Sequence, residues 1–114
     1  MSIYLTQVAY NTESWNKLVA NPQNRFDAIR TPIENLGGKL LNGWFSFGDY
    51  DAVCIIDMPS NVEVAAIAIA FAAGGACKGV KTTPLLTAAE GIDALKKAAK
   101  CGYKAPAAKA ASAR

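Results

Sequence analysis

Two aspartates and a tyrosine stand together in the segment Gly48-Asp49-Tyr50-Asp51. Carboxylates this close can serve as a general base, or as oxygen ligands of a hard cation. Two carboxylates alone rarely complete a cation site, and the segment offers no third. Glycine and aspartate also favour turns, because Gly adopts left-handed dihedral angles and Asp hydrogen-bonds to its own backbone. We interpret the segment first as a turn and only second as a ligand-binding element.

Other reactive side chains are scarce. The sequence contains no histidine, which excludes histidine-dependent triads, histidine metal sites and the commonest general base. The three cysteines, Cys54, Cys77 and Cys101, lack the spacing of a metal or redox pair. Cys54 lies in an apolar run, so its thiol is expected to be buried and structural. We predict neither a metal site nor a cofactor.

Aromatic residues are the remaining candidates for a binding site. Aromatic side chains with a few polar groups line many small-molecule pockets, although they also fill cores. Asp57 follows an apolar run and is the acidic residue to consider as a base. The candidate ligand-binding residues are therefore Tyr4, Tyr10, Trp15, Trp44, Asp49, Tyr50 and Asp57.

Alternating strand and helix patterns are expected to position these residues. Runs rich in β-branched and aromatic residues predict strands over 3–10, 39–47, 52–57 and 76–84. A first helix is predicted after Asn11. It restarts with Asn21 as cap and Pro22 as first helical residue, and it ends at Gly37-Gly38.

Two further helices have start signals. Ser60 with Glu63, and Thr87 with Glu90, have the spacing of a capping box. The helix after Ser60 is apolar on all sides, so we expect protein to cover it on both sides. It is too short to span a membrane, which takes about 20 residues.

The order of these elements predicts an α+β fold. Strand-helix-strand-strand-helix-strand, followed by a C-terminal helix, is the order of a ferredoxin-like βαββαβ domain with a four-stranded antiparallel sheet. Both internal helices would cover one face of this sheet. The strands over 3–10 and 52–57 are apolar on both faces, so the other face would expose an apolar patch. Two sheets packed face to face, as in a dimeric α/β barrel, would bury it. We therefore predict a homodimer or a higher oligomer.

The length of the chain fits a single domain, and its distribution of charge sets the C-terminal end apart from the rest. The chain has 114 residues, enough for a single domain, which we place at 1–101 with a basic, flexible tail over 102–114. Residues 1–93 contain six basic and nine acidic residues, and residues 94–114 contain six basic and no acidic ones. An acidic body makes a nucleic-acid partner improbable. Residues 1–15 do not have the pattern of a signal peptide, and together with the cysteine usage this favours a cytoplasmic location.

Three segments resemble the GYD-domain family, a small bacterial family named for the element at Gly48-Asp49-Tyr50-Asp51. They are "YLTQVAYNTESW", "GKLLNGWFSFGDYDAVCIIDMP" and "GGACKGVKTTPLLTAAEG", and the resemblance covers roughly residues 2–98. It implies a ferredoxin-like fold of the dimeric α/β-barrel type and brings no established catalytic residues. Pro32 departs from the family pattern, inside a predicted helix.

Two functions fit these observations. The first is a homo-oligomeric module that binds a small apolar ligand. The alternative is a cofactor-free enzyme acting on a small molecule in an aromatic-lined pocket, with Asp57 or Asp49 as base and a tyrosine as acid. An enclosed and partly polar cavity beside such an acid would favour the enzyme.

Overall fold

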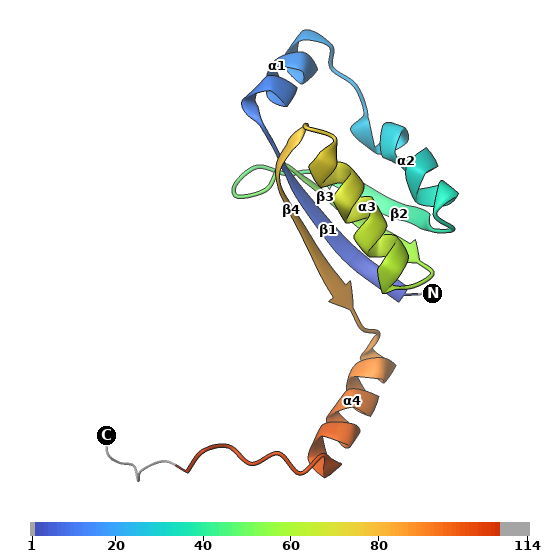
Figure 1. The fold of residues 1–114 in the computed structure, drawn as a ribbon, viewed down its shortest axis with the longest axis vertical. Helices are drawn as coiled ribbons and strands as arrows, with labels where there is room; N and C mark the ends of the chain where they lie inside the picture. The colour runs from blue at the N-terminus through green and yellow to red at the C-terminus, as the bar shows by residue number, and fades with distance from the viewer. Residues whose placement is uncertain (1, 108–114) are drawn as a thin grey trace.

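Four strands and three helices occupy the first 85 residues of the chain, and a fourth helix follows (Figure 1). The structure is a computed structural model that describes residues 2–107. The elements are β1 (Ser2–Tyr10), α1 (Thr12–Ala20), α2 (Arg25–Asn35), β2 (Lys39–Phe45), β3 (Ala52–Met58), α3 (Asn61–Ala73), β4 (Cys77–Leu85) and α4 (Ala88–Lys100).

The four strands form one open antiparallel sheet in the order β2-β3-β1-β4. The central strand β1 places Thr6 opposite Cys54 of β3 on one side and Thr82 of β4 on the other. The register with β4 shifts between Ala9, which pairs with Gly79, and Tyr10, which pairs with Cys77. The predictions of an α+β class, a four-stranded antiparallel sheet and a C-terminal helix are confirmed.

Local sequence signals account for most of the element ends. The Ser60 side chain accepts a hydrogen bond from the Val62 N–H and caps α3. Thr87 and Glu90 form a complete capping box at the start of α4. Gly37 ends α2 with a φ of +83°, a left-handed angle that side chains disfavour.

The prediction that Asn21 caps the second part of the first helix is wrong. Residues 21–24 separate α1 from α2, and the cap of α2 is Asn24, whose side chain accepts from the Phe26 N–H at 2.9 Å. Pro22 therefore lies in the connection and not at the first helical position. Pro32 lies inside α2, which continues past it to Asn35.

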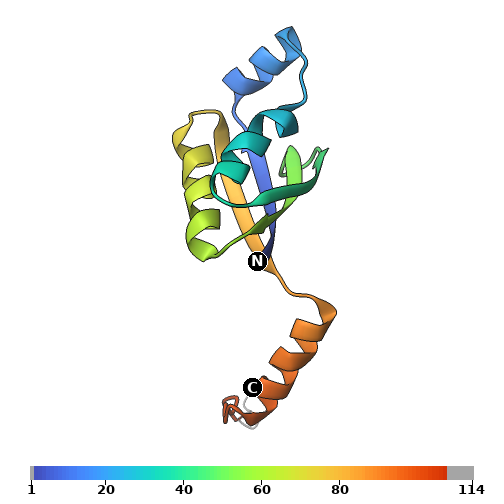
Figure 2. The same cartoon turned by 90° about the vertical axis from the view of Figure 1, so that its right-hand side faces the viewer.

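The core lies between one face of the sheet and the helices α2 and α3 (Figure 2). Side chains alternate across a strand, and the buried positions of β3 are all on this helix-covered face. Ile33 of α2, Ile56 and Met58 of β3, and Ile67 of α3 are its most deeply buried apolar residues.

In the described part of the chain, residues 2–107, no helix covers the opposite face of the sheet (Figure 2). Alternation places Leu5 of β1 with Val53 and Ile55 of β3 on this face, all of them partly exposed. Trp44 of β2 pairs with Val53 and is 51 % exposed. We call this apolar surface, with Ile3 at its end, the open face.

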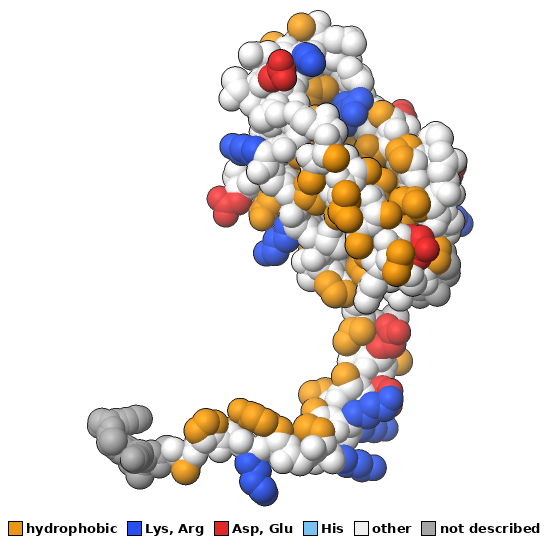
Figure 3. Space-filling view, in the orientation of Figure 1, with side chains coloured by type: hydrophobic (Ala, Val, Ile, Leu, Met, Phe, Trp, Pro, Cys, Tyr) orange, Lys and Arg blue, Asp and Glu red, His pale blue; other side chains and the backbone are white. Residues whose placement is uncertain are grey.

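Two helices also leave apolar surface uncovered. Apolar side chains gather over the outer side of α3, where Val62 and Ile69 are exposed (Figure 3). The prediction that protein covers α3 on both sides is therefore wrong for the chain on its own, because no described element packs on that side. Within residues 2–107, no helix combines the length and the apolar character needed to cross a membrane.

The last helix stands away from the body. Figures 1 and 2 show α4 beyond the end of β4, where it packs against none of the other described elements. Its apolar residues Ile92 and Leu95 are 53 % and 71 % exposed. The predicted tail over 102–114 lies outside the described residues from position 108 onward.

Candidate functional site

A cavity of about 320 Å³ opens between the sheet and the helices α2 and α3. Small side chains create this space, because larger residues would fill it at the positions of Ala28 of α2, Ala70 of α3 and Ala52 of β3. Larger apolar walls come from Phe26 and Ile29 of α2 and from Ile67 and Phe71 of α3. We call this cavity the inner pocket.

One buried polar group lines the apolar inner pocket. Thr6 of β1 is 2 % exposed, and its Oγ1 has no hydrogen-bond partner among the described residues. Buried hydroxyl groups in folded proteins are almost always hydrogen-bonded, because an unmade bond costs about 1–3 kcal/mol. The Thr6 hydroxyl therefore marks a position where a polar atom of a ligand would be stabilised.

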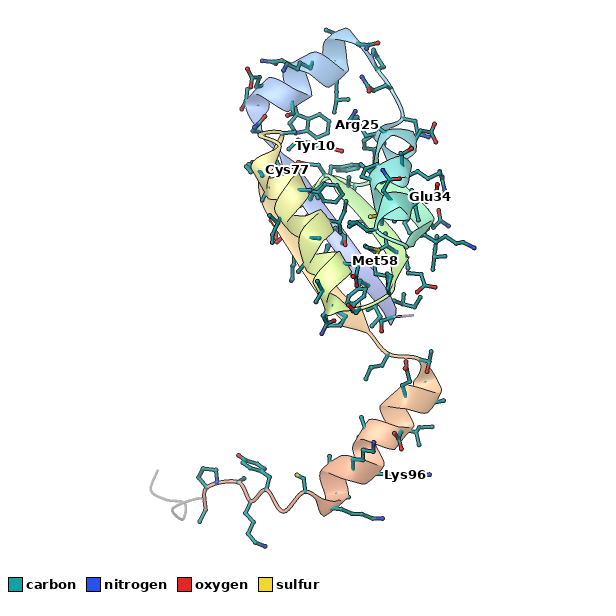
Figure 4. The ribbon with its side chains drawn as sticks, turned by 45° about the vertical axis from the view of Figure 1, so that its right-hand side comes forward. Tyr10, Arg25, Glu34, Met58, Cys77 and Lys96 are labelled. Atoms are coloured by element: carbon teal, nitrogen blue, oxygen red, sulfur yellow. The ribbon has the colours of Figure 1, made fainter. Side chains whose placement is uncertain are left out.

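Tyr10 and Arg25 stand at the end of the inner pocket, together with Cys77 (Figure 4). Burial raises the pKa of the Tyr10 hydroxyl, and the nearby Arg25 guanidinium offsets part of that rise. The ring of Trp15 meets the Tyr10 ring edge-on, with centroids 5.3 Å apart. α1 thus closes over the end of β1 through an aromatic contact.

A second hollow adjoins the inner pocket. It measures about 370 Å³ and is lined by α1, the segment before α2 and the loop between α3 and β4. Tyr10, Arg25, Gly74 and Ala76 line both cavities and form a neck between them. We call the second cavity the outer hollow. Its charged side chains are Glu13, Lys17 and Arg25.

Two thiols line the inner pocket, and neither is activated. Burial raises the pKa of Cys54 to about 11. Burial also raises the pKa of Cys77, which Arg25 lowers only in part. Because the thiolate is the nucleophile, both groups are poorly reactive at neutral pH. The prediction that Cys54 is a buried, structural cysteine agrees with its exposed fraction of 4 %.

Alkylation should separate the three thiols. At pH 8, a thiol of pKa near 11 is thiolate in only about one molecule in a thousand. We expect iodoacetamide to modify the exposed Cys101 first, the half-buried Cys77 more slowly, and Cys54 only after unfolding. Peptide mass spectrometry over time measures the order. Rapid labelling of Cys54 in the native protein would contradict the burial of this wall of the pocket.

The segment Gly48-Asp49-Tyr50-Asp51 is a turn that anchors the end of β1. Gly48 has a φ of +136°, an angle that glycine tolerates and other residues rarely adopt. Asp51 Oδ2 accepts a hydrogen bond from the Tyr10 N–H at 2.9 Å, and the Asp51 N–H donates to the Val8 carbonyl. The turn between β2 and β3 therefore holds Tyr10 at the neck of the pocket.

This geometry gives a structural role to the element that carries the family resemblance. A sequence profile described as the GYD domain matches residues 4–95. The chain belongs to the GYD domain family. No curated protein and no solved structure matches it. The family description names a domain and no activity.

The other predicted residues of this GYD domain lie apart from the pocket. Trp44 and Asp57 lie on the sheet face opposite the pocket, and Asp49 is exposed in the GYD turn. Tyr50 is half-buried in the same turn, where its carbonyl accepts from the Ser46 hydroxyl. Tyr4 is buried in the core, and its hydroxyl donates to Asn61 Oδ1 at 2.5 Å. Of the predicted site residues, Tyr10 lines the pocket, and Trp15 contacts it through the Tyr10 ring.

Sequence reasoning missed Thr6 and Arg25. A signal for Thr6 was present, because it is the one aliphatic polar residue on the strand face formed by Tyr4, Thr6, Val8 and Tyr10. Arg25 gave no local signal, since its position depends on how α2 meets the sheet. Among the described residues, no three carboxylate, thiol or imidazole groups gather as they would around a metal ion.

Proposed function

We propose that this GYD domain is a binding module for a small, largely apolar molecule that carries a polar group. The observation that carries the proposal is the Thr6 hydroxyl, which is buried beside an apolar cavity without a partner. A ligand hydroxyl or carbonyl next to Thr6 would supply the missing hydrogen bond. The cavity volume is at the lower end of the range for small-molecule pockets, which indicates a compact ligand.

Binding has more support than catalysis. Asp49 and Asp57, the two carboxylates considered as bases, lie outside both cavities. The ionisable groups that line the inner pocket are Tyr10, Arg25 and two thiols, and burial raises the pKa of the tyrosine and of both thiols. None of these groups is a base poised near neutral pH. The pocket is therefore better suited to holding a molecule than to removing its proton.

The same proposal includes a ferredoxin-like domain that pairs with a second copy as a dimeric α/β barrel. The strand order β2-β3-β1-β4, with α2 and α3 on one face, supports this arrangement. The open face supplies the apolar surface that a symmetric dimer would bury. The Oδ1 atom of Asp57, on the same face, is buried without a hydrogen-bond partner among the described residues, and a donor of the second copy would satisfy it.

The last helix extends this dimer proposal. α4 exposes Ile92 and Leu95 and has the basic residues Lys97 and Lys100 in its last turn. The residues before this helix, 1–87, hold six basic and seven acidic residues, a net charge of −1, whereas α4 holds three basic and two acidic residues, a net charge of +1. We propose that α4 packs on the body of the second copy, as part of the domain 1–101, and that only the residues beyond it form a tail. Three free cysteines support a reducing, cytoplasmic setting.

Native mass spectrometry of freshly purified protein tests both parts together. A dimer that carries one extra small mass per chain is the expected result, and the added mass gives the ligand to identify. A monomer would overturn the dimer proposal. If the dimer carries no added mass, binding is tested with an added probe. 4-Propylphenol is suitable because it is compact, largely apolar and carries one hydroxyl group.

Thr6→Val should act in opposite directions on stability and on binding. Valine keeps the shape of threonine and removes the unpartnered hydroxyl, so the free protein should gain about 1 kcal/mol or more in unfolding free energy. For a chain of this size the melting temperature would rise by about 4 °C. Affinity for 4-propylphenol should fall several-fold, whereas affinity for propylbenzene, which lacks the hydroxyl, should not.

The matched control is Thr82→Val, because Thr82 of β4 pairs with Thr6 of β1 but does not line the inner pocket. Methyl NMR locates the bound probe. The methyl groups of Thr6 and Ile67 report on the pocket, and in Thr6→Val the new valine takes the place of Thr6. The methyl groups of Ile3 and Ile55 report on the open face. A loss of stability in Thr6→Val would mean that the hydroxyl already has a partner in the protein. Shifts confined to Ile3 and Ile55 would place the probe on the open face and overturn the proposed pocket.

A further inference from the structure

Arg25 has guanidinium N–H donors without a partner among the described residues, at the neck between the inner pocket and the outer hollow. Its Nη1 donates to Gln23 Oε1 at 3.2 Å, the one side-chain hydrogen bond it makes in the described part of the chain. Over the same residues, no carboxylate lies within 4.0 Å of the guanidinium. A guanidinium has five N–H donors in a planar fork that matches a carboxylate.

Two backbone carbonyls of the loop beside the neck, in contrast, already accept hydrogen bonds. The Gly75 carbonyl accepts from the Asn11 side chain at 2.6 Å. The Ala76 carbonyl accepts from the Asn11 N–H and from the Ser14 hydroxyl. These bonds tie the loop between α3 and β4 to the start of α1. The neck therefore offers the unused donors of Arg25, while the carbonyls of Gly75 and Ala76 beside it are already bonded.

Positive side chains outnumber negative ones along the outer hollow, and the Asp51 carboxylate near the neck is already hydrogen-bonded to the Tyr10 N–H. The outer hollow is lined by Lys17 and Arg25 against a single carboxylate, Glu13. Arg25 is also the first residue of α2, whose N-terminus adds a positive partial charge. Arg25 is half-buried, so its attraction for an anion is screened less than at a fully exposed site.

We propose that the ligand of this pocket is a small monoacid whose carboxylate binds Arg25 and whose apolar body, carrying a hydroxyl or carbonyl group, enters the inner pocket toward Thr6. The inference rests on the proposed function, because the pocket must first accept a molecule. It adds that the ligand has an anionic end at the neck and a polar atom at the opposite, buried end. Thr6 and Arg25 line the same cavity from different elements, so one molecule can reach both.

Two matched probes test the anionic end. 3-(4-Hydroxyphenyl)propionate and 4-propylphenol share the phenol ring and the three-carbon chain, and they differ in a terminal carboxylate or methyl group. A charged hydrogen-bonded pair stabilises a complex more than a neutral contact does. We expect the acid to bind roughly tenfold more tightly than 4-propylphenol at low salt, with shifts at the Thr6 and Ile67 methyl groups.

Arg25→Gln removes the charge and keeps a long polar side chain that suits a helix. In this variant the acid should lose roughly tenfold in affinity, while 4-propylphenol should change less than twofold. Arg30→Gln is the matched control, because Arg30 is exposed on the same helix and lines neither cavity. It should leave the affinity for both probes unchanged.

The outcomes separate this inference from the proposed function. If 4-propylphenol binds in the pocket and the acid binds no more tightly, the inference is overturned and the proposed function stands. If the acid preference survives in Arg25→Gln, the carboxylate binds elsewhere and the inference is again overturned. If neither probe shifts the Thr6 and Ile67 methyl groups, the pocket does not take this class of molecule, and both proposals fail.

Discussion

Ile55→Lys is expected to convert the proposed dimer into a monomer. Ile55 lies on β3 at the centre of the open face, opposite Leu5 of β1. In the monomer the lysine side chain reaches water, so the fold should survive. In a symmetric dimer both copies would bury an unpaired charge, at about 2 kcal/mol or more each. The dissociation constant should rise roughly a thousandfold, which sedimentation equilibrium measures directly.

The matched control is Val19→Lys. Val19 is 78 % exposed on α1, away from the open face, so the same change of side chain should leave the dimer intact. Circular dichroism establishes that both variants remain folded. A dimer that persists in Ile55→Lys would show that the copies associate through another surface, for which the outer side of α3 is the next candidate. A native chain that is itself monomeric would remove the barrel proposal.

Local signals in the sequence predicted most of the helix ends correctly. Capping residues and terminal glycines act over one helical turn, so Ser60, Thr87 and Gly37 could be interpreted without knowledge of the tertiary structure. The break between α1 and α2 was placed incorrectly because Asn21 and Asn24 are both acceptable caps. The choice depends on packing, since α2 lies against β2 while α1 lies over Tyr10 at the end of the sheet.

The pocket was much harder to predict than the fold. It depends on alanines from α2, α3 and β3 that face one another only after folding, and no local pattern distinguishes them from other alanines. The aromatic residues were sound candidates by type, but strand alternation sends Tyr10 to the pocket face and Trp44 to the open face. The Asp51 contact with the Tyr10 N–H joins residues 41 positions apart, which explains why the GYD element could be identified as a turn but not as an anchor.

Gly38→Ala should strongly destabilise the protein. A Cβ atom at Gly38 would lie 2.8 Å from the backbone carbonyl oxygen of Asp57 and in collision with the Met58 sulfur. Met58 is fully buried, and the Asp57 carbonyl belongs to β3, so neither neighbour can move without disturbing the sheet. We expect a loss of about 2–4 kcal/mol in unfolding free energy.

Gly91→Ala is the matched control for this prediction. Gly91 lies in α4 with open space around it, so a methyl group there should be neutral or should stabilise the helix by up to about 1 kcal/mol. Urea unfolding at one fixed protein concentration compares the variants, because the stability of a dimer depends on concentration. If Gly38→Ala unfolds at the same urea concentration as the native chain, β2 does not approach β3 as closely as the structure has it. The packing of α2 beside the inner pocket would then need to be reconsidered, because the Gly37-Gly38 turn joins α2 to β2.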